Sequence, residues 1–265
     1  VTKAYENWME KMGARTDPLT DQPELATTMW AKLTAAAEKF NEPGRFSAVI
    51  GYEWTSVPGG NNLHRNVIFR DNKDKADQVF PFSSWNSEDP AKLHEWMEKY
   101  EQKTGGQVLA IPHNGNLSNG RMFELEDFAG KPLSRDYAER RARWEVLQEV
   151  MQTKGNSETH PTLSPNDEFA DYESYNFVMT VERRTPDPTE ADYARSGLKR
   201  GLALEAQLGA NPYKFGLIGS SDSHTGMSAV EETAFAGKSQ HDSFPGARSG
   251  PSGLGAAKGW DMGAA

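Results

Sequence analysis

The sequence contains no cysteine in its 265 residues. This absence excludes disulfide bonds, thiolate metal sites and cysteine nucleophiles, so a metal or catalytic site has to use histidine, aspartate and glutamate. It does not fix the compartment, because an exported protein can dispense with disulfides. We favour a periplasmic or secreted location over a cytoplasmic one.

The chain also lacks long apolar runs and a positive charge balance. No apolar stretch approaches 18 residues, so the sequence predicts no transmembrane helix. The net charge of −9 argues against nucleic acid or an anionic membrane as partner, since both require a basic face. The hydrophobic content of 36%, with seven tryptophans, is typical of a globular protein, and the length suits one α/β barrel domain. A small-molecule substrate is therefore the expected partner.

The two ends differ from the middle in composition. The chain begins at Val1 without methionine or a signal-like segment. Residues 1–23 are polar and predict a loop with one short helix, and residues 237–265 are rich in Gly, Ser, Ala and Pro. We expect a partial barrel domain over residues 1–236, followed by a loop or the start of a further part over residues 237–265.

Helical and strand-like patterns alternate along the middle of the chain. Helices are predicted over residues 24–40, 90–104, 134–143 and 189–208, the last opened by a capping-box-like Thr189-Glu-Ala-Asp192. Short apolar strands are predicted over residues 46–50, 66–69, 107–111, 145–151 and 214–218, with a long loop over 152–175. No internal repeat is present. This alternation favours a parallel sheet or barrel of the α/β class.

Four of the predicted strands run into ligand-type polar side chains. In a (β/α) barrel the carboxyl ends of the strands open on one face, so residues far apart in sequence would meet there. Carboxylates and imidazoles without cysteine suit Zn, Mn or Fe, and more than one ion. The residues are Glu53, His113, the group Gln148, Glu149 and Gln152, and the pair Asp222 and His224.

Asp222-x-His224 is the strongest single motif. Residues i and i+2 at a strand end point to the same side, so one oxygen and one nitrogen ligand can face one cluster. The preceding Gly-Ser-Ser and following Thr-Gly predict a tight loop. The alternative is a surface turn that happens to carry a histidine.

His113 and Glu53 are the next candidates. His113 follows Ile111-Pro112 and precedes Asn114-Gly115, which predicts a fixed imidazole at a strand end; a turn histidine without a ligand role is the alternative. Glu53 could bridge two ions through its two oxygens, although a lone glutamate after a strand is also common by chance.

Other polar residues allow more than one interpretation. Glu149 and Gln152 compete as the ligand from the third strand, because the register is ambiguous there. His64 and Arg65 precede a strand and could contact a substrate or its phosphate, since Arg binds phosphate in a bidentate manner. The polar loop 114–120 could close over the site or be an ordinary loop.

The three remaining histidines have simpler interpretations. His94 lies on a helix face and is expected to be structural. His160 and His241 lie in loops, where an exposed surface position is the default expectation.

Five segments together resemble the domain-of-unknown-function 3604 family, which is similar to the PHP (polymerase and histidinol phosphatase) superfamily of metal-dependent phosphoesterases. The match extends from about Phe46 to Gly226. The segments are Gly51-Tyr-Glu-Trp-Thr55, His64-Arg-Asn-Val-Ile68, Ile111-Pro-His-Asn114, Glu149 to Glu158, and Gly219-Ser-Ser-Asp-Ser-His224.

The resemblance implies a distorted (β/α)7 TIM-like barrel of PHP type, incomplete in this chain, with two or three metal ions in the complete site. It implies that Glu53 is the bridging carboxylate and that His113 binds a second ion. Asp222 and His224 match the last ligand motif, and the position after the fifth strand falls on Glu149 or Gln152. The superfamily opens with a His-x-His motif, but no histidine precedes Glu53 here. We expect either that a segment N-terminal to Val1 supplies those ligands or that this polypeptide binds metal incompletely.

These features predict a metal-dependent hydrolase, in the first place a phosphoesterase that uses a metal-bridging hydroxide as nucleophile. One alternative is hydrolysis of a non-phosphate ester or an amide, because a barrel does not determine the chemistry. The other is a non-catalytic binding module that the metal cluster stabilises.

Overall fold

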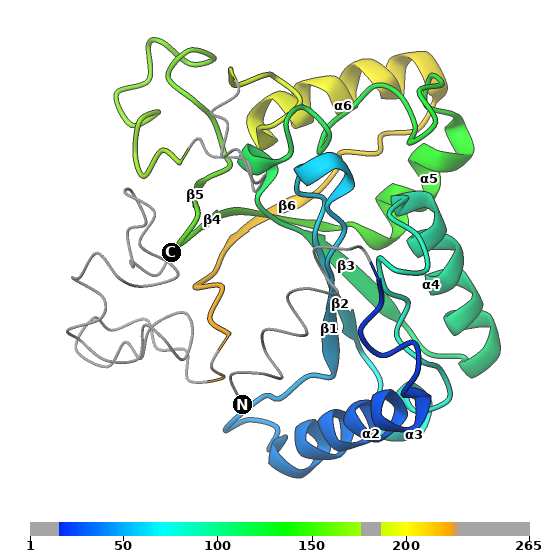
Figure 1. Cartoon of the computed structure of the whole chain (residues 1–265). Helices are drawn as coiled ribbons and strands as arrows, with labels where there is room; N and C mark the ends of the chain where they lie inside the picture. The colour runs from blue at the N-terminus through cyan, green and yellow to red at the C-terminus, as the bar shows by residue number, and fades with distance from the viewer. Residues whose placement is uncertain (1–15, 176–186, 225, 227–265) are drawn as a thin grey trace. The chain divides into compact units, whose positions relative to one another are not determined.

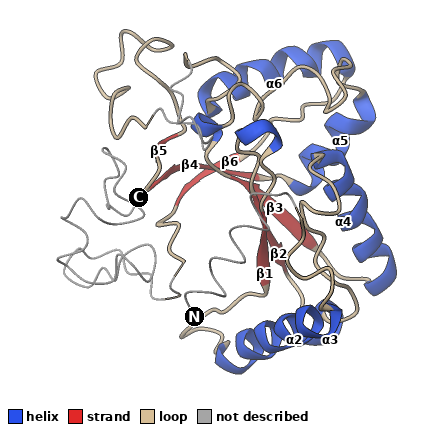
Figure 2. Cartoon of the chain, in the orientation of Figure 1, coloured by secondary structure: helices blue, strands red, loops and turns tan. Residues whose placement is uncertain are grey.

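The computed structural model describes residues 16–175, 187–224 and 226. By contact density the chain forms two units, Val1–Ser56 with Asn66–Ala110, and Val57–Arg65 with Ile111–Ala265. The architecture is mixed α/β, with five α-helices and two three-stranded sheets in the described residues (Figure 2). No closed barrel is present in this part of the chain. No helix within it is both long and apolar enough to cross a bilayer.

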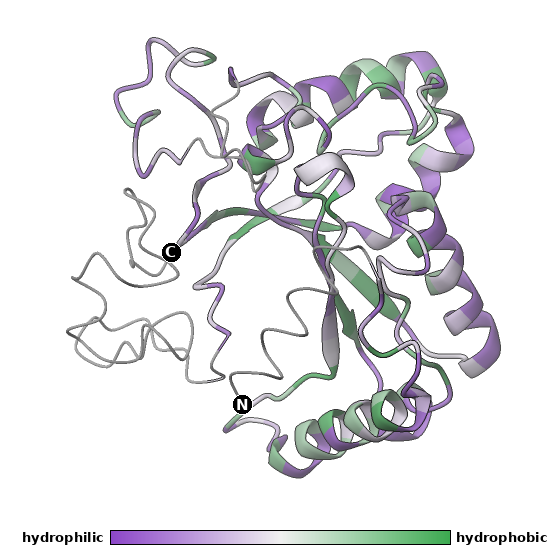
Figure 3. Cartoon of the chain, in the orientation of Figure 1, coloured by the Kyte–Doolittle hydropathy of each residue, from purple (hydrophilic) through white to green (hydrophobic). Residues whose placement is uncertain are grey.

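The first unit contains a sheet of strand order β1-β2-β3 and three helices (Figure 1). The strands are β1 (Gly51–Trp54), β2 (Arg65–Phe69) and β3 (Val108–Pro112); Arg65 of β2 and the last two residues of β3 belong to the second unit. The helices are α2 (Pro23–Phe40), α3 (Lys73–Ala76) and α4 (Pro90–Thr104). The ribbon of β3 is hydrophobic along its length in Figure 3, as expected of a buried strand.

β2 runs in the opposite direction to its neighbour β3. At one end Arg70 N donates to Gln107 O (3.0 Å), and at the other His113 N donates to His64 O (3.4 Å). The two residue numbers of each pair have the same sum, which is the signature of antiparallel pairing. This differs from the purely parallel arrangement expected from the alternation of helices and strands. It places the start of β2 beside the end of β3.

The core of this unit is aromatic. Phe69 of β2 has its ring centroid 5.0 Å from that of Tyr100 and 5.8 Å from that of Trp30, and Tyr52 of β1 meets Trp96 edge-on at 5.9 Å. The two pairs with Tyr100 and with Trp96 are edge-to-face, and such pairs add about 0.5–1.5 kcal/mol each beyond the area that they bury. They fix α2 and α4 against the sheet, so the ends of the strands are well defined.

Helix α4 has the bounds that the sequence predicted. Asp89 caps it by accepting a hydrogen bond from Ala91 N (2.9 Å), Pro90 occupies the first turn, and Gly105 ends it with φ +62°. Glycine adopts this left-handed conformation without the steric cost of a Cβ. His94 is fully buried on this helix, which agrees with the expected structural role.

Helix α2 forms as predicted, but its periodic apolar residues do not face the core. Ala26, Trp30 and Thr34 are the buried positions. The apolar residues that recur at helical spacing in its sequence are exposed: Leu25, Met29, Leu33 and Phe40. Helical spacing therefore identified the helix but not its buried face.

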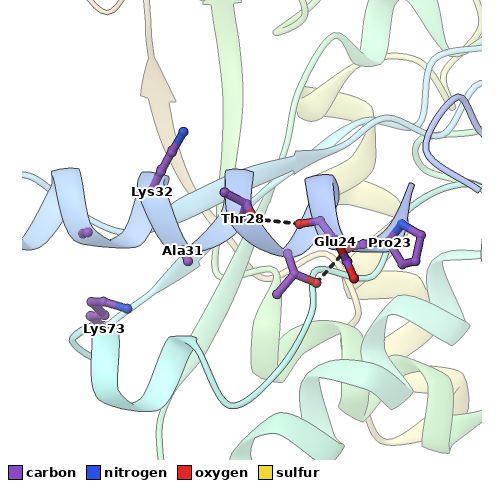
Figure 4. Close-up of a pocket in the computed structure, with 8 residues that line it drawn as sticks. Pro23, Glu24, Thr28, Ala31, Lys32 and Lys73 are labelled. Atoms are coloured by element: carbon purple, nitrogen blue, oxygen red, sulfur yellow. Dashed lines mark hydrogen bonds between the residues drawn. The ribbon is translucent and has the colours of Figure 1, made fainter. Parts of the chain in front are cut away.

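A groove of about 790 Å³ runs along α2 beside α3 (Figure 4). Thr28 lines it, and its hydroxyl donates to Glu24 O (2.7 Å) of the same helix. Lys32 and Lys73 extend from its rim in Figure 4. The hydroxyl of Thr28 is thus already hydrogen-bonded within the helix.

The strand predicted over residues 46–50 is shifted. Glu42 and Phe46 form an isolated antiparallel bridge that closes a tight turn, with hydrogen bonds of 2.8 and 2.9 Å in both directions. Phe46 and Val49 are exposed, so this apolar run buries little surface. The strand consists instead of Gly51–Trp54, one segment further along the chain.

The second unit contains a sheet of order β5-β4-β6 with two helices (Figure 1). The strands are β4 (Leu147–Gln152), β5 (Gly155–Asn156) and β6 (Gly216–Gly219), and the helices are α5 (Arg135–Trp144) and α6 (Ala194–Leu208). Strand β4 pairs with β6 in parallel and with β5 in antiparallel orientation. The predicted strands over 145–151 and 214–218 are confirmed within two residues, and the long loop contains the short strand β5.

The core of the second unit surrounds α6. Phe123 packs edge-on against Tyr213 with ring centroids 5.4 Å apart, and Leu63, Leu133 and Leu204 belong to the same cluster. Because Leu63 belongs to it, the chain next to His64 is anchored in this core.

The contacts of Asp71 predict how the stability of the first unit depends on pH. It accepts hydrogen bonds from Gln107 N (2.6 Å) and from the Tyr100 hydroxyl (3.0 Å), and Lys75 lies 3.1 Å away. Burial opposes ionisation, but these contacts outweigh it and hold the pKa of Asp71 below its ordinary value. A depressed carboxyl pKa contributes stability above the unfolded pKa, and this contribution is lost as pH falls through the folded pKa. We expect Asp71→Asn to cost roughly 1 kcal/mol at pH 7 and to have no effect once Asp71 is protonated in acid.

Urea unfolding of both proteins at several pH values measures this difference. An Asp71→Asn cost that does not shrink in acid would contradict the assignment.

Candidate metal site in the second unit

His64 and His113 meet at the antiparallel start of β2 and end of β3. Their rings pack edge-on with centroids 5.4 Å apart, and both side chains are buried. Pro112 precedes His113, and Asn114 follows with φ +52°, a left-handed conformation that asparagine tolerates. The chain turns away sharply after His113, which confirms the expected turn and leaves the imidazole at the strand end.

Glu149 of β4 is electrostatically coupled to the same region. Burial raises the pKa of its carboxyl above the ordinary value, and nearby Asp222 adds to the rise, whereas His113, Lys154 and a hydrogen bond from Ser220 oppose it. One oxygen accepts the Ser220 hydroxyl. The other, Oε1, is buried without a hydrogen bond from any described residue. A buried carboxylate oxygen of this kind is suited to a cation.

Asp222 and His224 lie beyond the end of β6, as the motif predicted. Asp222 Oδ1 and His224 Nε2 are 3.2 Å apart, so the two side chains do share one side of the loop. Asp222 Oδ2 forms an ion pair with Lys154 Nζ. The side chain of Asp222 is mostly buried, whereas that of His224 is 54% exposed.

Gln152, the alternative to Glu149 as the ligand from β4, is hydrogen-bonded to the surrounding loops. Its Nε2 donates to Asn114 Oδ1 (3.1 Å) and its Oε1 accepts from Lys154 N (2.8 Å). Asn116 Nδ2 donates to Lys154 O (2.9 Å) and to Tyr175 O (3.0 Å). These bonds attach the start of the polar loop 114–120 to the β4–β5 hairpin, so residues 114–118 are a buried, fixed part of the site.

Arg65 lies in a buried ion-pair network. Its Nε is 3.1 Å from Glu145 Oε1, and Arg141 Nε is 2.8 Å from Glu145 Oε2. Arg65 Nη1 also donates to Leu63 O, across His64. The Arg65 side chain, anchored by Glu145, therefore links the residues before and after His64 and holds the backbone around it.

His64 and His113 each offer one nitrogen that could hold a metal ion, and these two atoms lie within 4.8 Å of each other. Glu53 lies in β1, which belongs to the first unit. Glu53 is exposed, and the two histidines are buried.

His160 and His241 were expected to lie in exposed loops. The ring of His160 has its Nδ1 2.9 Å from Thr162 Oγ1 and its centroid 5.8 Å from that of Tyr193. Burial lowers the pKa of His160. His241, residues 1–15 and residues 237–265 lie outside the described residues.

The sequence analysis did not single out Lys154. It lies in the tight turn between β4 and β5 and is only 6% exposed. A lysine before a glycine in a polar stretch carries no distinctive signal. Only the pairing of β4 with both β5 and β6 brings it to Asp222.

The comparisons with known proteins give one match. The model of the family described as "Protein of unknown function (DUF3604)" matches residues 2–265. Neither the curated proteins nor the solved structures yield a significant match. Since the family match covers nearly the whole sequence, the chain belongs to the DUF3604 family.

Proposed function

We propose that this protein is a metal-dependent hydrolase and that its substrate is a phosphate ester. The supporting observations, all in one unit, are the paired rings of His64 and His113, 5.4 Å apart, and the electrostatic interaction of Glu149 with both His113 and Asp222. Two buried imidazoles and two largely buried carboxylates form an oxygen and nitrogen donor set that suits Zn or Mn. Perturbed ionisable groups gathered in this way are typical of functional sites.

The donor geometry fits a first-row divalent ion. Two ligand atoms bonded to one zinc lie at most about 4.4 Å apart, which is twice a bond length of roughly 2.2 Å. The nitrogens that His64 and His113 offer lie within 4.8 Å of each other, so only small side-chain adjustments are needed to reach this separation. Glu149 Oε1 and Asp222 are candidate ligands of a further ion.

In this proposal each residue has a separate role. His64 and His113 bind through imidazole nitrogens, and Glu149 and Asp222 through carboxylate oxygens. The pairing of Arg65 with Glu145 favours a positioning role, holding His64, over the phosphate contact that the sequence suggested. When bound, divalent ions would acidify water and neutralise charge on the phosphate oxygens.

The finer features implied by the family resemblance remain part of this proposal. They are the (β/α)7 barrel of PHP type, further ligands from outside this chain, and His224 as a ligand at the exposed rim of the site. Gln152 is the less favoured ligand from β4, because both ends of its amide are hydrogen-bonded.

Metal content and phosphate release test the proposal. After dialysis against Zn²⁺ or Mn²⁺ and removal of free ion, we expect at least one bound ion per chain by elemental analysis. We also expect release of inorganic phosphate from a phosphomonoester. His113→Ala should lose most of the bound ion, because removing a ligand typically weakens binding by at least tenfold.

His160→Ala is the matched control, since it removes a histidine of the same unit that lies outside the cluster, and it should retain the metal. Undiminished metal in His113→Ala, or no metal in the unaltered chain, would refute the metal site. Metal binding accompanied by release of sulfate or amine instead of phosphate would replace the phosphoesterase with another hydrolase.

A further inference from the structure

We propose that Lys154 binds the anionic phosphate group of the substrate. This inference rests on the proposed function and adds a residue to it. Lys154 lies at the tip of the β4–β5 hairpin, between Gln152 of β4 and Gly155 of β5. Its ammonium forms an ion pair with Asp222, one of the proposed metal ligands.

The position of Lys154 is fixed by its backbone. Its N–H donates to Gln152 Oε1 (2.8 Å), and its carbonyl accepts from Asn116 Nδ2 (2.9 Å). The side chain is 7% exposed, although lysine is almost never fully buried unless it is paired. A solvated surface lysine has neither a fixed backbone nor a buried ammonium. Lys154 has both, and it lies near Glu149 and Asp222.

The charge balance around Lys154 explains why an anion would bind there. Without a metal ion, Asp222 compensates the buried charge of Lys154. Once the Asp222 carboxylate binds a divalent cation, its negative charge is shared with that cation, and the ammonium lies beside a net positive centre. Leaving a buried charge uncompensated is costly. A phosphate oxygen placed between the ion and Nζ restores the balance, and lysine is a common phosphate ligand that acts as a point charge.

Binding of inorganic phosphate to the metal-loaded chain tests this role separately from turnover. Lys154→Gln removes the charge but retains a donor for Asp222, which protects the fold. Lys154→Arg retains the charge. Lys199→Met, on the exposed face of α6, removes one positive charge elsewhere in the same unit and serves as the matched control.

We expect Lys154→Gln to weaken phosphate binding by roughly tenfold or more in titration calorimetry, as for loss of a charge-assisted hydrogen bond. Lys154→Arg should stay within about threefold of the unaltered chain, and Lys199→Met should leave phosphate affinity unchanged. Metal affinity in Lys154→Gln should be equal or higher, because a competitor for Asp222 is gone. Melting temperatures of all variants verify that they are folded.

Each outcome has a distinct meaning. Unchanged phosphate affinity in metal-loaded Lys154→Gln would overturn the role of Lys154 but leave the metal site intact. Weaker metal binding in Lys154→Gln would show a structural role instead and would also overturn the inference. Failure of the unaltered chain to bind metal would refute the proposed function itself, and this inference with it.

Discussion

Glu145→Gln is expected to lower the free energy of unfolding by about 3–5 kcal/mol, the usual cost of breaking a buried ion pair from one side. Glu145 faces two guanidinium groups, those of Arg65 and Arg141, and all three side chains are at most 4% exposed. Removing its charge leaves two buried cations without the carboxylate that they share. Urea unfolding at pH 7 measures the loss.

Glu139→Gln is the matched control for this prediction. Glu139 also pairs with an arginine four residues earlier, Arg135 Nε at 2.7 Å, but these side chains are 53% and 66% exposed. An exposed pair with this spacing contributes about 0.3–0.5 kcal/mol, so we expect little change. Similar losses in the two variants would show that burial of the network does not determine its contribution. The same Glu145→Gln variant should weaken metal binding, because Arg65 and Leu63 hold the backbone around His64.

Helices with local end signals were predictable from the sequence. α4 has Asp89 before it and Gly105 after it, and α5 begins after Ser134, whose hydroxyl accepts from Tyr137 N (3.1 Å). These signals act within one turn, so a single sequence contains them. The helix bounds agree with the prediction within about one residue.

The start of α6 shows where a local signal was misleading. Thr189 and Asp192 do interact, with Asp192 Oδ2 accepting from Thr189 N (2.8 Å) and Thr189 Oγ1 (2.9 Å). Asp192 Oδ1, however, accepts from Ser118 Oγ (3.0 Å) in a distant loop. The motif therefore joins two loops instead of opening the helix, which begins at Ala194. Sequence spacing cannot reveal a partner 74 residues away.

The candidate site was predictable only in part, again because the sequence does not reveal which distant segments meet. His113 and Asp222 follow strands, and Glu149 lies within β4, so all three could be selected as polar residues of predicted strands or strand ends. His64 precedes a strand and was given a different role, because the direction of β2 is a tertiary property. The choice between Glu149 and Gln152 was open because the register of β4 against β6 shifts between Glu149 and Met151. Such a bulge breaks the alternation of faces on which sequence interpretation depends.

Gly155→Ala is the second variant with a large expected effect, a loss of about 3 kcal/mol or more in the free energy of unfolding. Gly155 has φ +90°, and a Cβ there would lie 2.5 Å from Tyr175 Cβ and 2.6 Å from Glu173 O. Backbone strain and overpacking each cost roughly 1–3 kcal/mol, and here they occur together. The nearest atoms are backbone or Cβ, so no flexible side chain can relieve the contact.

Gly130→Ala separates these two causes. Gly130 has φ +75°, but the nearest atom to an added Cβ is Glu126 Oε2 at 3.9 Å, so this variant introduces the backbone strain alone. We expect it to cost about 1 kcal/mol. If Gly155→Ala costs no more than Gly130→Ala, the close packing of the β4–β5 hairpin against residues 173–175 is wrong. Because that hairpin also carries Lys154 and Gln152, Gly155→Ala should weaken phosphate binding by the metal-loaded chain, whereas Gly130→Ala should not.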